Sequence, residues 1–159
     1  MTDPVLPGAE PYSAAGDARG ALVLHGFTGN PQSMRGLATA LADAGLTVEL
    51  PLLPGHGTSV ADMVPTRWED WSAAAEAAYI ELAARCDAVV AVGLSMGGTL
   101  SVWLAERHPE IAALVVVNPL IEPPDAGEHL VEETGLAGHV RGWGAWSVER
   151  GAWSVKREA

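Results

Sequence analysis

Short, almost wholly apolar segments alternate with longer segments of helical periodicity over residues 18–124. The apolar segments are rich in β-branched residues, as buried strands are. They are Ala21–Leu24, Thr47–Leu50, Ala88–Val92 and Ala113–Val117. Strands that lack a polar face and are separated by helices predict a parallel sheet with helices on both faces. The expected fold class is therefore α/β, with a mostly parallel sheet.

The first helix is predicted after Asn30, which can cap it, with Pro31 at its first position and Gly45 at its end. Its apolar residues recur at helical spacing and are Met34, Leu37, Ala38 and Leu41. The third predicted helix follows the 88–92 strand directly and ends near His108.

The second helix is predicted from residue 67 to about residue 84. Thr66-Arg67-Trp68-Glu69 has the form of a capping box, in which Glu69 reaches back to the helix start. Trp68 and Trp71 lie three residues apart, and we expect both in the core rather than against a ligand. The acidic residues of this helix are expected on a solvated face; they are Glu69, Asp70, Glu76 and Glu81.

The length, net charge and cysteine content of the chain limit the functions that it can have. The chain has 159 residues, enough for one domain with a core, and a formal net charge of −11. That charge argues against nucleic acid or an anionic membrane surface as a partner, because both need basic faces. Cys86 is the single cysteine, so an internal disulfide is excluded. No signal peptide and no apolar run of about 18 residues is found, so we expect a cytoplasmic protein without a membrane span.

The alternating pattern ends near Pro124. We therefore divide the chain into residues 1–124, the α/β part, and an atypical tail over residues 125–159. The tail contains a near-repeat, residues 144–150 and 151–157, that is too short for a coiled coil and receives no packing role. Without a further strand, Ala113–Val117 would lie at an exposed sheet edge, which favours self-association.

The most informative motif is Gly93-Leu94-Ser95-Met96-Gly97, where an apolar strand runs into a helix. This is the layout of a nucleophile elbow, with a serine on a sharp strand-to-helix turn. Side chains at the two glycines would collide with the neighbouring strand or helix. Ser95 is thus the candidate nucleophile, and it needs a base to take its proton. The backbone N–H groups of Met96 and Phe27 are the candidate oxyanion donors.

Two further glycine-rich loops leave strands at the same edge of the predicted sheet: His25-Gly26-Phe27-Thr28-Gly29 and Leu53-Pro54-Gly55-His56-Gly57. His25 precedes the oxyanion loop, and a hydrogen bond to the loop backbone is favoured over catalysis. His56 is favoured as a loop-shaping or substrate-contacting residue over acid–base chemistry. With Gly26, these two histidines are the candidate substrate-binding residues.

The order and spacing of these loops, the tryptophan helix and Gly93–Gly98 resemble the α/β-hydrolase superfamily, specifically bacterial carboxylesterases and monoacylglycerol lipases. The resemblance covers about residues 18–124. It implies hydrolysis of short or medium acyl esters or monoacylglycerols through an acyl-enzyme on Ser95. It also implies a Ser-Asp-His triad, with no cofactor and no metal, and it makes His56 part of a loop lining the acyl pocket.

The chain departs from that family after Ser95. The family's acid and histidine follow two further strands, which are not seen here, so the sheet would lack its last strands and the tail would be the start of a cap region or altered sequence. Asp125 is the only aspartate after Ser95. His108 ends the helix behind the elbow and is expected to point away from Ser95. Asp125 with His139 has the right order, and the other histidine is His129. The alternative function is an inactive fragment that acts at most as a binding module.

Overall fold

The computed structural model describes residues 3–120, 146–149 and 152–155. Within these ranges the strands form one sheet in the order β1-β3-β2-β4-β5-β7-β6. The strands are β1 (Tyr12–Ala14), β2 (Arg19–Leu24), β3 (Thr47–Leu50), β4 (Ala88–Leu94), β5 (Ala113–Val117), β6 (Trp146–Glu149) and β7 (Ala152–Val155). Strands β3, β2, β4 and β5 run parallel, whereas β1, β7 and β6 pair antiparallel with their neighbours. The predicted mostly parallel sheet is confirmed.

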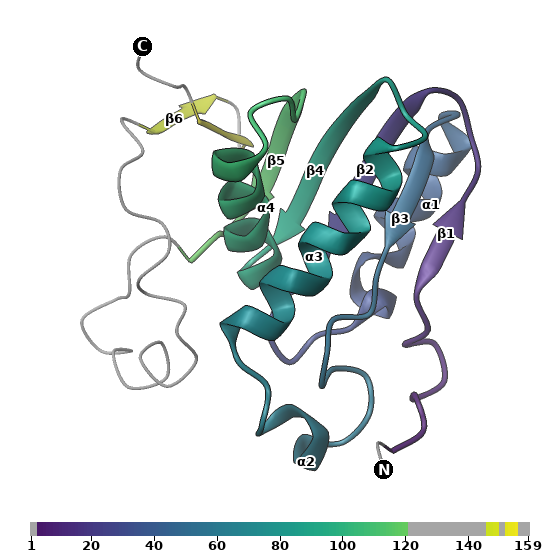
Figure 1. Ribbon diagram of the computed structural model, residues 1–159, viewed down its shortest axis with the longest axis vertical. Helices are drawn as coiled ribbons and strands as arrows, with labels where there is room; N and C mark the ends of the chain where they lie inside the picture. Colours follow the sequence, from purple (N-terminus) through teal and green to yellow (C-terminus); the bar gives the residue numbers. More distant parts are fainter. Residues whose placement is uncertain (1–2, 121–145, 150–151, 156–159) are drawn as a thin grey trace.

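Helices cover both faces of the sheet. The helices are η1 (Pro31–Met34), α1 (Arg35–Asp43), α2 (Val60–Met63), α3 (Trp68–Ala83) and α4 (Met96–Arg107). Figure 1 shows α3 and α4 in front of the sheet and α1 behind it. In β2, Leu22 and Leu24 pack toward α3 and α4, and Ala21 and Val23 pack toward α1. This alternation lets the apolar residues of one strand fill two cores at once, so the expected α/β architecture is confirmed.

The ends of the first helical segment match the sequence signals. Asn30 accepts a hydrogen bond from the Gln32 N–H at 2.9 Å, and Pro31 opens a 3₁₀ turn that leads into α1. Gly45 follows with φ +93°, a conformation that side chains rarely adopt. Of the apolar residues at helical spacing, Met34 and Ala38 are buried, whereas Leu37 is exposed.

Helix α3 lies where the sequence predicts a helix, but it begins one residue later and is capped by a different acid. The Asp70 carboxylate, rather than Glu69, accepts a hydrogen bond of 2.8 Å from the Arg67 N–H. The helix starts one residue later than the motif implied, so the acid three positions after the cap is Asp70. Trp68 and Trp71 are both buried in the core on this face, as expected.

The tail contributes two strands that the sequence interpretation missed. Strands β6 and β7 come from the two halves of the near-repeat and pair antiparallel, with Trp146 opposite Val155 and Val148 opposite Trp153. Alternation of Trp and Val with Ser is a strand pattern, and a short connection containing Gly151 suits a hairpin. The near-repeat therefore has a place in the sheet, which the sequence interpretation could not assign to it.

Strand β5 is consequently not an edge strand. It pairs with β7 on its outer side, with Val116 opposite Trp153. Within the described residues the outermost strands are β1 and β6. Self-association through a sheet edge stays a prediction, but β5 would not supply that edge. The boundary drawn at residue 124 lies outside the described residues.

Candidate active site

Ser95 occupies the turn between β4 and α4 in a strained backbone conformation, with φ 52° and ψ −120°. Positive φ is rare for residues other than glycine and typically costs about 1–3 kcal/mol. A Cβ at Gly93 would lie 2.1 Å from the Gly97 carbonyl oxygen, and one at Gly97 would lie 2.1 Å from the Leu24 carbonyl oxygen. The steric role expected for both glycines is therefore observed.

Gly26 lies directly beside Ser95. A Cβ built on Gly26 would approach the Ser95 Cβ to 3.3 Å and its Oγ to 3.9 Å. The loop after β2 and the turn after β4 thus meet at the carboxyl edge of the sheet, where functional groups gather in parallel sheets. The absence of a side chain at Gly26 keeps the space beside the serine hydroxyl open.

His25 is completely buried and uses both ring nitrogens. Its Nε2 accepts a hydrogen bond from the Leu53 N–H at 3.1 Å, which leaves the proton on Nδ1, and Nδ1 donates to the Gly26 carbonyl oxygen at 3.0 Å. Burial lowers the pKa of His25 to about 4, and the bond to Gly26 opposes this shift only in part. The neutral ring ties the loop after β2 to the loop after β3.

His56 lies in the loop after β3 and is held there by its own hydrogen bonds. Its Nδ1 donates to the Pro54 carbonyl oxygen at 2.9 Å, and the Trp71 Nε1–H donates to the same oxygen at 3.1 Å. Burial lowers the pKa of His56 as well. Its Nε2 is buried without a hydrogen-bond partner among the described residues.

Edge-to-face ring contacts join these residues into one aromatic cluster. Phe27 lies 5.5 Å from Trp71 and 5.9 Å from His56, and His25 lies 5.1 Å from His56, between ring centroids. Such contacts favour a fixed geometry beyond the burial of apolar area. The cluster therefore braces the loops after β2 and β3 against α3.

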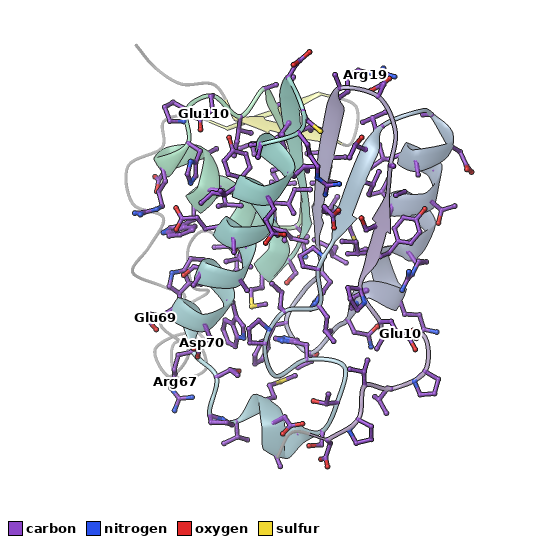
Figure 2. All side chains as sticks on the ribbon, turned by 45° about the vertical axis from the view of Figure 1, so that its right-hand side comes forward. Glu10, Arg19, Arg67, Glu69, Asp70 and Glu110 are labelled. Carbon is purple, nitrogen blue, oxygen red and sulfur yellow. The ribbon has the colours of Figure 1, made fainter. Side chains whose placement is uncertain are left out.

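His108 lies at the far end of α4 from Ser95. The helix between them has 12 residues, or about 18 Å. The His108 Nε2 lies 2.9 Å from Glu76 and its Nδ1 lies 3.4 Å from Glu110. Figure 2 shows Glu110 at the opposite end of the molecule from Arg67 and Asp70, the residues that start α3. Because Glu76 contacts His108, its carboxylate is paired with a side chain, whereas the sequence predicts only a solvated face.

The other triad candidates, Asp125, His129 and His139, lie outside the described residues. Of the three described histidines, two are locked into loop hydrogen bonds and the third is remote. No group of three or more potential metal ligands occurs among the described residues. None of the helices described is long and apolar enough to cross a membrane.

The sequence interpretation missed one contact at this edge. Thr99, buried in the first turn of α4, hydrogen bonds to both the N–H and the carbonyl of Leu120. A single threonine in an apolar helix gives no pattern signal. Only its closeness to Ser95 in sequence could have drawn attention to it.

Comparison with known proteins agrees with this geometry. The chain is 51% identical over 121 residues to a thermostable monoacylglycerol lipase from Bacillus sp. (strain H-257), covering 76% of this chain and 48% of that protein. It is 35% identical over 101 residues to a carboxylesterase from Bacillus subtilis (strain 168), covering 63% of this chain and 41% of that protein. The chain thus spans about half the length of these curated relatives.

Solved structures give the same result. One from a study of the metagenome-derived lipolytic enzymes LipS and LipT matches with a TM-score of 0.76 and 46% identity, over 80% of this chain and 52% of that one. A monoacylglycerol lipase from Paleococcus ferrophilus shares the fold, with a TM-score of 0.61 and 22% identity over 82% of this chain and 51% of that one. The alpha/beta hydrolase fold family matches residues 22–143, and the chain belongs to this family.

Proposed function

We propose that the chain carries the nucleophile and oxyanion hole of a carboxylic ester hydrolase, with Ser95 as nucleophile. The observation that carries the proposal is the strained Ser95 backbone at the strand-to-helix turn, with Gly26 open beside its hydroxyl. The likeness to a monoacylglycerol lipase and a carboxylesterase supports short or medium acyl esters, or monoacylglycerols, as substrates.

In the proposed reaction the Ser95 Oγ attacks the ester carbonyl carbon while a base takes the hydroxyl proton. The tetrahedral intermediate then expels the alcohol, which receives that proton, and the acyl group stays on Oγ. Water attacks the acyl-enzyme in the second half of the reaction and releases the carboxylic acid. Neither a metal nor a cofactor takes part in these steps.

The oxyanion would be held by the backbone N–H groups of Met96 and Phe27. Met96 is the first residue of α4, where N–H groups have no intrahelical partner and the helix dipole favours negative charge. Phe27 lies in the loop beside Ser95, and the ring contacts with His56 and Trp71 hold this loop. Donors fixed before the charge develops are the effective ones in catalysis.

His25, Gly26 and His56 would shape the substrate side of the site. We propose that Gly26 leaves space for substrate beside Ser95. His25 and His56 would be uncharged side chains that hold the two loops in position. His25 is a poor candidate for the base, because its Nε2 already accepts the Leu53 N–H. We assign no acid or base: Asp125 and His139 have the right order, but only 13 residues separate them in the sequence and no predicted strand carries them.

The second candidate function is an inactive binding module of the same fold. It is favoured by the engagement of His25 and the remoteness of His108, because loss of the triad base lowers the rate by several orders of magnitude.

A cytoplasmic location also remains part of the proposal and rests on the sequence alone.

The test is hydrolysis of p-nitrophenyl butyrate by the whole chain, beside Ser95→Ala and a control, Ser72→Ala. Ser72 is a buried serine of α3 whose hydroxyl bonds to the Glu69 carbonyl in its own helix. An active enzyme should lose its rate in Ser95→Ala and keep it in Ser72→Ala, with or without EDTA. Equal rates in the wild type and Ser95→Ala would overturn the esterase proposal for this chain.

A further inference from the structure

Ser95 and two residues in the first turn of α4 contact the end of β5 and the segment that follows it. The Ser95 N–H donates to the Val117 carbonyl at 2.9 Å, and a Cβ at Gly98 would lie 3.1 Å from the Pro119 Cβ. Thr99 makes the third attachment, at Leu120. Between them the chain turns sharply, because Asn118 has φ 51°.

The Thr99 hydroxyl satisfies both backbone groups of a single residue. Its Oγ1 donates to the Leu120 carbonyl at 2.8 Å and accepts from the Leu120 N–H at 3.1 Å. Thr99 is fully buried and Leu120 is partly buried, so the two hydrogen bonds are partly shielded from bulk water. Removing the hydroxyl would leave a partly buried donor and acceptor of Leu120 without this partner, which costs more than losing a fully exposed bond.

The same residue forms part of the turn that carries Ser95. The Thr99 N–H donates to the Ser95 carbonyl at 3.1 Å, the first α-helical bond of α4. Thr99 therefore connects the backbone of the candidate nucleophile to the exit of β5. Strained conformations persist only where the surrounding structure over-determines them, and this connection supplies such support.

We propose that Thr99 is a positioning residue for the esterase site. The two hydrogen bonds between its hydroxyl and the Leu120 backbone, called the clasp below, hold the Ser95 turn and the Met96 N–H in their reactive arrangement. This inference rests on the proposed function and goes beyond it. The clasp acts through the backbone, and Thr99 itself does not touch substrate. Loss of the clasp should therefore lower the rate of acylation more than the affinity for ester.

The test compares Thr99→Val, which removes the hydroxyl at nearly constant shape, with Thr99→Ser, which retains it. The chain offers a matched control in Thr47, which is also buried. Its hydroxyl donates to the Asp17 carbonyl at 2.8 Å and accepts from the Gly16 N–H at 3.0 Å. Thr47→Val thus removes an equivalent clasp at the start of β3, at the opposite edge of the sheet from Ser95.

Two readouts are needed: the second-order rate of Ser95 labelling by a fluorophosphonate, and hydrogen exchange of the Leu120 amide. In Thr99→Val we expect labelling to slow about tenfold or more, since small misplacements in a site cost this much. The Leu120 amide should exchange faster. In Thr99→Ser and Thr47→Val, labelling should stay within about threefold of wild type. In ester hydrolysis, Thr99→Val should lower kcat with KM little changed.

The outcomes separate this inference from the proposed function. If Ser95 of the wild type is labelled and Thr99→Val is labelled at the same rate, the positioning role is overturned and the esterase proposal stands. A Leu120 amide that is unprotected in the wild type refutes the clasp itself. An unreactive wild-type Ser95 overturns the proposed function, and the positioning role with it. If Thr99→Val does not fold, Leu120→Pro removes the N–H that the Thr99 hydroxyl accepts and fixes the local φ, and labelling must slow in the same direction.

Discussion

The backbone N–H of Ser95 donates a hydrogen bond of 2.9 Å to the carbonyl oxygen of Val117. Leu94 is already paired with Val117 in the parallel ladder between β4 and β5, so this bond extends the ladder into the turn. The sheet therefore fixes the N–H side of Ser95, and α4 fixes its carbonyl side. This relationship explains how a strained serine is held at the edge of the sheet.

The close contact between Gly97 and Leu24 predicts a large cost for any side chain at position 97. Gly97→Ala would place a Cβ 2.1 Å from a backbone oxygen of β2, so backbone must move. We expect the free energy of unfolding to fall by about 2–3 kcal/mol, as measured by urea denaturation.

The control for that prediction is Gly36→Ala in α1, where no atom lies within 4 Å of the added Cβ. Because alanine is the better helix former, this variant should gain about 0.5–1 kcal/mol. If both variants change stability by the same amount, crowding at the elbow is not the cause.

The buried His25 predicts acid sensitivity. Its pKa is about 4 in the folded chain against an ordinary value of 6.5, so the unfolded chain binds the proton first as the pH falls. The stability that the neutral ring contributes is full above pH 6.5 and is lost as the pH falls toward 4. At about 1.4 kcal/mol per pKa unit, the loss is of the order of 3 kcal/mol.

Proton NMR of the His25 ring, together with urea denaturation between pH 7 and pH 4, tests this directly. The ring resonances should titrate near pH 4, and His25→Gln should show a shallower pH dependence of stability. Titration near the ordinary histidine value, with an unchanged pH slope in the variant, would contradict the assignment of a neutral ring bonded to Leu53 and Gly26.

The Trp71 indole predicts a modest and specific loss of stability. Trp71→Phe keeps an aromatic ring against Phe27 but removes the N–H that donates to the Pro54 carbonyl. A net loss of about 1 kcal/mol for the hydrogen bond is expected, with a further contribution from the smaller ring. Urea denaturation should detect it, and faster amide exchange over residues 53–57 should accompany it. A variant as stable as the wild type would show that this bond does not hold the loop.

The Glu76 and His108 pair predicts a weak coupling remote from the site. Hydrogen bonds from His108 and Arg107 lower the pKa of Glu76, so its contribution is present above pH 4.5 and is lost as the pH falls through the lowered value. A double-mutant cycle with Glu76→Gln and His108→Gln should give a coupling below about 1 kcal/mol at neutral pH. Neither change should alter ester hydrolysis. A loss of activity in either variant would mean that this end of α4 communicates with Ser95.

The parallel strands and their helices could be predicted because each β-branched strand and each amphipathic helix carries its own periodic signal. The capping acid of α3 could not, since Glu69 and Asp70 are adjacent and only the true helix start decides between them. The β6 and β7 pair was missed because its glycine-bearing near-repeat was judged by helical rather than strand periodicity.

The candidate site was predictable to a similar extent. Ser95 and its glycines follow from a local motif, because the steric demands of the turn are local. The protonation state of His25 and the clasp of Thr99 depend on partners 28 and 21 residues away in the chain, at Leu53 and Leu120. Contacts of that separation leave no periodic trace in one sequence.

The most direct measurement of the central claim is intact-protein and peptide mass spectrometry after treatment with a fluorophosphonate. We expect one adduct per chain, located on Ser95, that is absent from Ser95→Ala and from urea-unfolded protein. A chain that forms no adduct, or forms it equally in Ser95→Ala, would contradict the claim that Ser95 is an activated nucleophile.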